Sequence, residues 1–190
     1  MKSLVIDQST GLVVGARQVL SPHFDPRPSG VQPELIIVHG ISLPPDDYGG
    51  PWIDRLFTGN LPAEAHPYFD AIAGRRVSAH VLIRRDGEPV QYVPFDHRAW
   101  HAGASSHRGR EACNDFSVGI ELEGSDAVPY EAPQYETLAA LIRALRLAYR
   151  SLADAEVVGH SDVAPGRKTD PGAAFDWATL ESLLSPGDCP

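Results

Sequence analysis

The pattern that most constrains the fold is a long amphipathic helix set between two short, apolar, strand-like runs. From Pro133 to Leu152 the apolar positions follow helical spacing: Leu138, Leu141, Ile142, Leu145, Tyr149 and Leu152. Before this helix, Phe116–Leu122 is apolar and rich in β-formers, and after it Glu156–Gly159 has the length of a short strand. Strands and helices mixed in this way predict an α/β fold, with a central mixed β-sheet flanked by helices.

Other segments support this prediction. Leu35–His39 is a short apolar run ended by Gly40, which is typical of a buried strand. Residues 79–84 and 90–93 alternate around a turn at 85–88 and predict a β-hairpin, and Phe175–Leu184 predicts a helix capped by Asp176. Residues 41–77 predict a long irregular segment with short helices near 51–57 and 66–73. A loop of that length is often one wall of a functional site.

Composition limits the possible functions. The chain has 190 residues, of which 43% are hydrophobic, and this predicts one compact domain over residues 1–190. The formal net charge of −9 argues against a nucleic-acid partner or an anionic membrane surface. The two cysteines, Cys113 and Cys189, form no C-x-x-C motif and are interpreted as reduced thiols. No signal-peptide pattern or membrane-span pattern is present, so we expect a cytoplasmic protein, with monomer as the default state.

Candidate metal ligands cluster in the loop Gly159–Pro171, which contains His160, Lys168 and Asp170. Imidazole and carboxylate groups bind catalytic metals, and one further ligand would complete a three-ligand zinc site with an open position. His39 is the best candidate, because it ends a predicted buried strand and strand ends converge at one edge of a sheet. A single histidine after an apolar run is more often a core residue. A second histidine at a strand end, followed by Lys and Asp, favours the metal site.

Glu121 and Glu123 lie two residues apart in a predicted strand, so both carboxylates would face the same side of the sheet. A general base among apolar neighbours and a solvated strand face both agree with this pattern. His97, His101 and His107 lie close to Trp100, and we interpret this segment as a substrate wall rather than a second metal site. The chemistry favoured is metal-assisted amide hydrolysis, in which Lys168 stabilises the oxygen that gains negative charge.

Many ordered motifs resemble those of the AmpD family, the cytosolic anhydro-N-acetylmuramyl-L-alanine amidases with the amidase type 2, or peptidoglycan-recognition-protein-like, fold. The similarity extends from about Gln18 to Leu183. The blocks that carry it are Val38-His-Gly-Ile-Ser-Leu-Pro-Pro45, Gly49-Gly-Pro-Trp-Ile-Asp54, Val77-Ser-Ala-His80, Leu82-Ile-Arg-Arg-Asp-Gly87, Val90-Gln-Tyr-Val-Pro-Phe95, Arg98-Ala-Trp-His-Ala-Gly103, Cys113-Asn-Asp-Phe-Ser117, Gly119-Ile-Glu-Leu-Glu-Gly124 and Arg167-Lys-Thr-Asp-Pro-Gly172.

The resemblance implies a role for each residue of the site. His39, His160 and Asp170 would bind one Zn²⁺, Glu121 would be the catalytic carboxylate, and Lys168 would stabilise the transition state. The substrate would be a muropeptide from peptidoglycan recycling, cut between the lactyl group of anhydro-N-acetylmuramic acid and L-alanine. Arg76 and Trp100 match positions that contact the sugar and peptide.

Two positions depart from the family pattern. Gly40 stands where relatives have Asn directly after the first ligand, and Ala112 stands where relatives have a basic residue. Both positions are expected to contact substrate, so we expect weaker binding, seen in KM more than in kcat.

Two alternatives to a cytosolic recycling amidase remain. An exported or phage-type amidase acting on intact peptidoglycan would share the fold and chemistry, but the absent signal peptide and the long 41–77 segment argue against it. A non-catalytic muropeptide-binding module would typically have lost a metal ligand, whereas all three candidates are present here.

Overall fold

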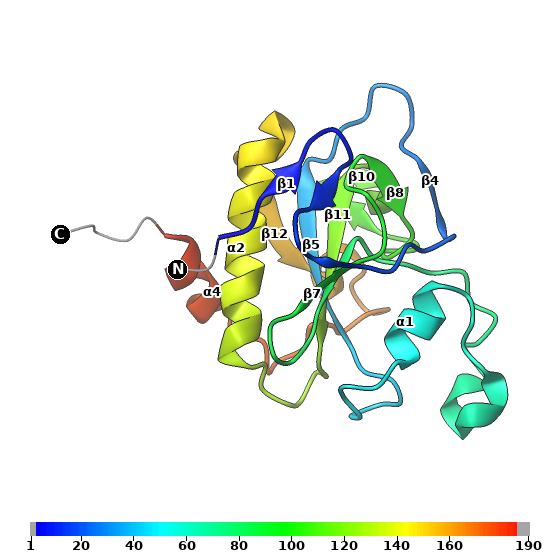
Figure 1. Cartoon of the computed structure of the whole chain (residues 1–190). Helices are drawn as coiled ribbons and strands as arrows, with labels where there is room; N and C mark the ends of the chain where they lie inside the picture. Colours follow the sequence, from blue (N-terminus) through cyan, green and yellow to red (C-terminus); the bar gives the residue numbers. More distant parts are fainter. Residues whose placement is uncertain (1–2, 186–190) are drawn as a thin grey trace.

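The structure is a computed structural model and describes residues 3–185. Within these residues, six strands form one central sheet (Figure 1). Their order across the sheet is β12 (Glu156–Gly159), β5 (Leu35–Ile41), β11 (Ser117–Glu123), β6 (Val81–Ile83), β7 (Pro89–Gln91) and β3 (Arg17–Gln18). Strands β12, β5, β11 and β6 run parallel to one another. Strand β7 runs antiparallel to β6, and β3 runs parallel to β7. The prediction of a mixed central sheet flanked by helices is therefore confirmed.

Strand β11 occupies a central position because its residues are suited to burial on both sides. It pairs with β5 over seven residues and with β6 over three, and every residue from Ser117 to Glu123 is buried. Parallel strands of this kind have both faces covered by other elements. The predicted strand at Glu156–Gly159 and the hairpin of β6 and β7 are also present.

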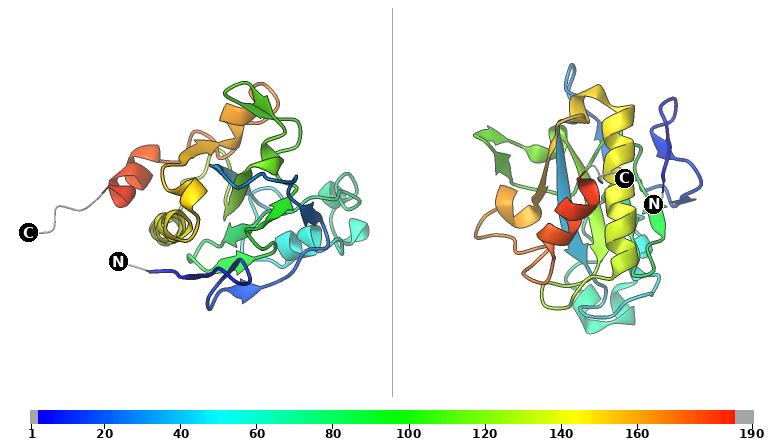
Figure 2. Two further views of the ribbon diagram at one scale, coloured as in Figure 1. Left: turned by 90° about the horizontal axis from the view of Figure 1, so that it is seen from above. Right: turned by 90° about the vertical axis from the view of Figure 1, so that its left-hand side faces the viewer.

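One face of the sheet is covered by two packed helices, α2 (Ala132–Ala148) and α4 (Trp177–Leu184) (Figures 1 and 2). The apolar stripe of α2 packs on the alternate strand residues Ile36, Val38, Ile120 and Leu122. Glu131 and Gln134 form a capping box that begins α2, which satisfies backbone N–H groups at its first turn. Asp176 caps α4 by accepting a hydrogen bond from the Thr179 N–H, as predicted.

The opposite face is covered by the long segment between β5 and β6 and by the loops around β8 (Figure 2). The long segment contains α1 (Trp52–Phe57) and two 3-10 turns, η1 (Ala63–Ala65) and η2 (Pro67–Phe69). The predicted helix near 51–57 is confirmed. The one predicted near 66–73 is present only in part, because the 3-10 helix η2 ends at Phe69 and hydrogen-bonded turns follow it to Gly74. A run of that length is too short to propagate a helix.

The remaining elements are short. Three two-stranded pairs are formed by β1 (Ile6–Asp7) with β2 (Leu12–Val13), β4 (Phe24–Pro26) with β8 (His97–Ala99), and β9 (Ser106–His107) with β10 (Arg110–Glu111). The last helical turns are η3 (Cys113–Asp115), η4 (Arg150–Leu152) and α3 (His160–Val163). No helix within residues 3–185 has both the length and the apolar character needed to cross a bilayer. Cys113 is buried with a free thiol, and Cys189 lies outside the described residues.

Candidate active site

Three candidate ligands meet at the carboxyl edge of the sheet. His39 Nδ1 lies 2.9 Å from His160 Nδ1 and 3.2 Å from Asp170 Oδ2, and the second histidine lies 3.0 Å from the same oxygen. A tetrahedral centre with metal–nitrogen bonds of about 2.0–2.1 Å separates its ligand atoms by about 3.3 Å, so these spacings suit a metal. In the chain from residue 3 to residue 185, no other group of His, Cys, Asp and Glu meets the same test.

The strand pairing explains why ligands 121 residues apart converge. Strands β5 and β12 are parallel neighbours in which Gly159 pairs with Val38, so His160 and His39 are the next residues along each chain. The chain then turns into α3 and returns through a loop in which the Ser161 N–H donates to the Asp170 carbonyl at 3.0 Å. That bond holds the carboxylate beside the two imidazoles. His39 does not end its strand as predicted, because β5 continues two residues further alongside β11.

The protonation states of His39 and Asp170 favour metal binding. Burial lowers the pKa of His39 to about 4, although the nearby carboxylate of Asp170 opposes this, so the imidazole is neutral near pH 7. Burial alone would raise the pKa of Asp170, but the close contacts of its carboxylate with the rings of His160 and His39 keep that pKa below its ordinary value. Two imidazoles and one carboxylate form the donor set of a catalytic metal site with an open position.

Glu121 lies directly beside this triad, because it pairs with His39 across β11 and β5. Its side chain is buried, and its Oε2 atom has no hydrogen-bond partner within the described residues. Burial raises the pKa of Glu121 well above its ordinary value, the negative charge of Asp170 raises it further, and the positive charge of Lys168 lowers it. A buried, unpaired carboxylate with a raised pKa beside a metal site is suited to proton transfer.

Glu123 has a different environment, although it lies on the same strand. Its Oε1 atom accepts hydrogen bonds from Arg84 Nη1 at 2.9 Å and from the Gly49 N–H at 2.7 Å. The carboxylate therefore forms an ion pair with Arg84 of the hairpin and a hydrogen bond with Gly49 of the long segment, and so joins the two. Both glutamates are buried, so the alternative of a solvated strand face is wrong.

A cavity of about 590 Å³ opens in front of the triad. His39, His160, Asp170, Glu121 and Lys168 all line it. Lys168 is exposed at the wall, where its backbone N–H donates to the Ala164 carbonyl at 3.0 Å. The long segment supplies the facing wall, in agreement with the role expected of a loop of that length; its lining residues include Leu43, Leu56, Tyr68 and Arg75. Neither Arg75 nor Tyr68 belongs to a sequence pattern with a chemical signature, so their place in the cavity wall is not predictable from sequence.

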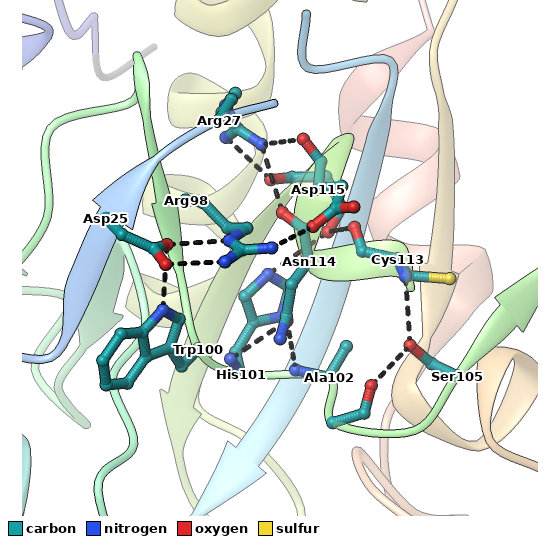
Figure 3. A network of polar contacts seen from close by, with 12 residues as sticks. Asp25, Arg27, Arg98, Trp100, His101, Ala102, Ser105, Cys113, Asn114 and Asp115 are labelled. Carbon is teal, nitrogen blue, oxygen red and sulfur yellow. Dashed lines mark hydrogen bonds and ion pairs between the residues drawn. The ribbon is translucent and has the colours of Figure 1, made fainter. Parts of the chain in front are cut away.

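Of the three predicted substrate contacts, two line the cavity and one does not. Trp100 and Gly40 line the cavity. Arg76 is not a lining residue, but its guanidinium lies 5.0 Å from the centroid of the Trp100 ring. Trp100 Nε1 donates to Asp25 Oδ1 at 3.0 Å, which fixes the plane of the indole (Figure 3). Arg76 therefore reaches the cavity only through Trp100.

The two positions that depart from the family pattern also differ. A Cβ atom at Gly40 would overlap the Tyr130 hydroxyl, which donates to the Pro171 carbonyl at 2.9 Å. An asparagine at position 40 would displace that tyrosine, so this substitution would change more than one contact. Ala112 is exposed with a φ of 58° and does not line the cavity that contains the triad. It borders a separate hollow next to Arg167.

The family model of N-acetylmuramoyl-L-alanine amidase matches residues 29–173. The 1,6-anhydro-N-acetylmuramyl-L-alanine amidase AmpD of Escherichia coli (strain K12) is 61% identical, covering 92% of this chain and 95% of that protein. The crystal structure of a selenomethionine AmpD derivative superposes with a TM-score of 0.91 at 57% identity, covering 95% of this chain and 99% of that one. A complex of the E. coli amidase AmiD with anhydro-N-acetylmuramic acid-L-Ala-D-γ-Glu-L-Lys has a TM-score of 0.56 at 26% identity, covering 96% of this chain and 66% of that one.

Proposed function

Because the chain belongs to the N-acetylmuramoyl-L-alanine amidase family and is thus an amide hydrolase, we propose that it is a zinc enzyme acting on anhydromuramyl peptides. The bond cut joins the lactyl group of 1,6-anhydro-N-acetylmuramic acid to L-alanine of the stem peptide. The single observation that supports this proposal best is the position of Glu121. It is a buried carboxylate with a free oxygen, in register with His39 and lining the same cavity as all three candidate ligands.

His39 Nδ1, His160 Nδ1 and Asp170 Oδ2 are the atoms that would hold the zinc ion. When bound in such a site, zinc supplies Lewis-acid chemistry and makes water a nucleophile near neutral pH. Glu121 accepts the proton of the water that attacks the lactyl carbonyl carbon. Lys168, on the cavity wall, donates to the carbonyl oxygen as that oxygen gains negative charge. Glu121 then returns the proton to the nitrogen of L-alanine, which leaves as a free amine.

The cavity walls provide for substrate binding. Trp100 presents a flat aromatic surface held by Asp25, and Arg76 lies against it. Gly40 leaves room beside His39 that the Tyr130 hydroxyl partly occupies. We assign Trp100 to direct substrate contact, Arg76 to an indirect contact through that ring, and Gly40 to the mouth of the site.

The proposal extends to the oligomeric state and the cellular location of the enzyme. The enzyme acts as a monomer in the cytoplasm on muropeptides recovered from peptidoglycan, and residues 1–190 form one amidase domain whose core spans about residues 18–183. The net charge of −9 agrees with a small-molecule substrate rather than a nucleic acid or an anionic membrane. Sedimentation of the purified protein and fractionation of cells test the oligomeric state and the location.

The direct test uses anhydromuramyl tripeptide as substrate. We expect release of the free tripeptide to stop when a chelator removes the metal and to return when stoichiometric Zn²⁺ is added. Glu121→Gln, loaded with zinc in the same way, serves as the control that keeps the metal but lacks the base. Peptide release that ignores chelation would refute the zinc mechanism, and near-full activity of Glu121→Gln would refute the role of Glu121.

A further inference from the structure

The outer nitrogens of both candidate histidine ligands are bound by two consecutive residues. His39 Nε2 lies 2.9 Å from His101 Nδ1, and His160 Nε2 lies 3.1 Å from the Ala102 carbonyl oxygen. Metal-binding histidines depend on such outer contacts, because the atom that binds the outer nitrogen decides which ring nitrogen is left to bind the metal. One short segment therefore contacts both ligands.

The contact at His160 has only one possible direction. The Ala102 carbonyl accepts and cannot donate, so the proton of His160 lies on Nε2. Nδ1 then keeps its lone pair, and this is the atom that faces Asp170 and His39. A backbone carbonyl is the usual partner for this purpose.

The contact at His39 is between two imidazoles, and its direction follows from Ser117. The Ser117 hydroxyl lies 2.6 Å from the Cys113 carbonyl oxygen, which can only accept, so the single hydroxyl proton is used there. Ser117 Oγ also lies 3.2 Å from His101 Nε2 and must accept at that contact. The proton of a neutral His101 therefore lies on Nε2, and its Nδ1 lone pair accepts from His39 Nε2–H. This leaves the Nδ1 lone pair of His39 facing the metal position.

The segment that makes these contacts is held by Asn114. Its side-chain Oδ1 accepts from the Ala102 N–H at 2.7 Å and from the His101 N–H at 3.2 Å, and Figure 3 shows both bonds side by side. The ring of His101 lies flat against strand β11 at Gly119, where a Cβ atom would overlap the ring. The position of the ring is thus set by the Asn114 bonds to its own backbone and by the close approach of the ring to Gly119.

We propose that His101 is a positioning residue that, through Ser117, holds His39 in the tautomer able to bind zinc; this inference rests on the proposed function. His101 also lines the cavity, but in this role it acts on the zinc only through His39. An imidazole takes the place usually filled by a carboxylate or a carbonyl, so its effect depends on the tautomer that Ser117 imposes.

The test compares two variants of the same shape, His101→Asn and His101→Leu. The side-chain oxygen of Asn branches from the same carbon atom as Nδ1 of the histidine ring, so it can accept from His39 Nε2–H, whereas Leu offers no acceptor. The measurement is the zinc dissociation constant by competition with a chromogenic chelator. We expect His101→Leu to bind zinc about 10–100-fold more weakly than wild type, and His101→Asn to recover most of that loss. Equal affinities for the two variants would overturn the inference.

A second measurement uses the wild-type protein and does not depend on a variant that folds. Long-range ¹H–¹⁵N correlation spectra of the zinc-loaded protein distinguish the two ring tautomers. We expect His101 as the Nε2–H form, and an Nδ1–H form would overturn the inference. A wild-type protein that binds no zinc would refute the proposed function, whereas zinc binding that is unaffected by His101→Leu would refute only the role of His101.

Discussion

The regions around Glu121 and Glu123, both on strand β11, differ in whether a buried carboxylate is paired with a cation. Glu121 lies in the cavity beside the three candidate ligands, and one of its oxygens has no partner within the described residues. Glu123, two residues further on and also buried, is bound by Arg84 and by the Gly49 N–H. The same residue type on the same face of the same strand is therefore left uncompensated in one place and neutralised in the other.

The region around Glu123 is an extended ion-pair cluster, defined here as Glu123, Arg84, Asp54, Arg17 and Tyr92. Arg84 Nη2 lies 3.6 Å from Asp54 Oδ1, Arg17 Nη1 lies 2.8 Å from Asp54 Oδ2, and the Tyr92 hydroxyl donates to Asp54. The cluster ties α1 to the sheet. The comparison teaches that a buried carboxylate indicates a reactive site only where no cation neutralises it.

The sharpest test of the comparison is Glu121→Gln. We expect kcat for anhydromuramyl tripeptide to fall by about 10²–10⁴, the range typical of a lost general base. The metal-free protein is expected to become more stable at pH 7. In the folded state burial raises the pKa of Glu121, so stability is lost as pH rises through that pKa, and glutamine avoids this loss. Steady-state kinetics and urea unfolding measure the two effects, and a variant both active and destabilised would contradict the assignment.

Glu123→Gln is expected to lower the stability of the fold and to leave the catalytic activity unchanged. Removing one partner of a buried ion pair leaves Arg84 partly uncompensated, and we expect the free energy of unfolding to fall by about 3 kcal/mol. The zinc affinity and kcat of the folded fraction are expected to stay near their wild-type values. A double-mutant cycle with Arg84→Met measures the coupling between the two side chains. A large loss of kcat without destabilisation would show that Glu123 belongs to the reactive region.

Lys168→Met tests the positive charge on the reactive side. We expect kcat to fall by about a hundredfold, because a donor to the developing oxyanion is lost. Binding of zinc is expected to persist, since no ligand atom changes. The matched control is Arg75→Met, which removes another cation from the same cavity without removing the proposed oxyanion donor. Equal losses in the two variants would indicate a general effect of charge in the cavity.

The smallest expected effect is a shift in pH dependence. The base role proposed for Glu121 requires an ionised carboxylate, so kcat/KM is expected to fall as pH decreases through the pKa of Glu121, which burial raises well above its ordinary value. The charge of Lys168 lowers that pKa, so Lys168→Met should move the acid limb to higher pH. Glu123→Gln should leave the limb in place. Profiles of kcat/KM measured at constant ionic strength decide this, and a limb that moves with Glu123 instead would contradict the separation of the two regions.

Local patterns predicted most of the elements. The helical spacing in Pro133–Leu152 matches α2, although the helix ends at Ala148 and a 3-10 turn follows, because Tyr149 takes an extended conformation. The sequence predicts that β5 ends at His39, because Gly40 follows it and glycine commonly ends a strand. In the structure this glycine continues the strand, and it makes room for the Tyr130 hydroxyl from a distant loop. A tertiary contact of that kind leaves no periodic signal in the sequence.

The residues of the candidate site were also largely predictable from the sequence, but their individual environments were not. His39, His160, Asp170 and Lys168 stood out because ligand-type residues followed strand-like runs, and the structure brings all four to one cavity. The alternation of a strand placed Glu121 and Glu123 on one face but did not distinguish a base from an ion-pair partner. His101 was noted as part of an aromatic and polar wall, and its contact with His39 was not foreseen.

The sequence by itself determined the fold class, the candidate ligands and the shared face of the two glutamates, because these follow from hydrophobic spacing and from the chemistry of single side chains. Only the tertiary structure decided which glutamate is neutralised, which histidine contacts His39 and whether Arg76 lines the cavity. The physical reason is that the charge state and tautomer of a buried group are set by its immediate neighbours. Those neighbours come from distant parts of the chain: Arg84 for Glu123, and Ser117 and Asn114 for His101.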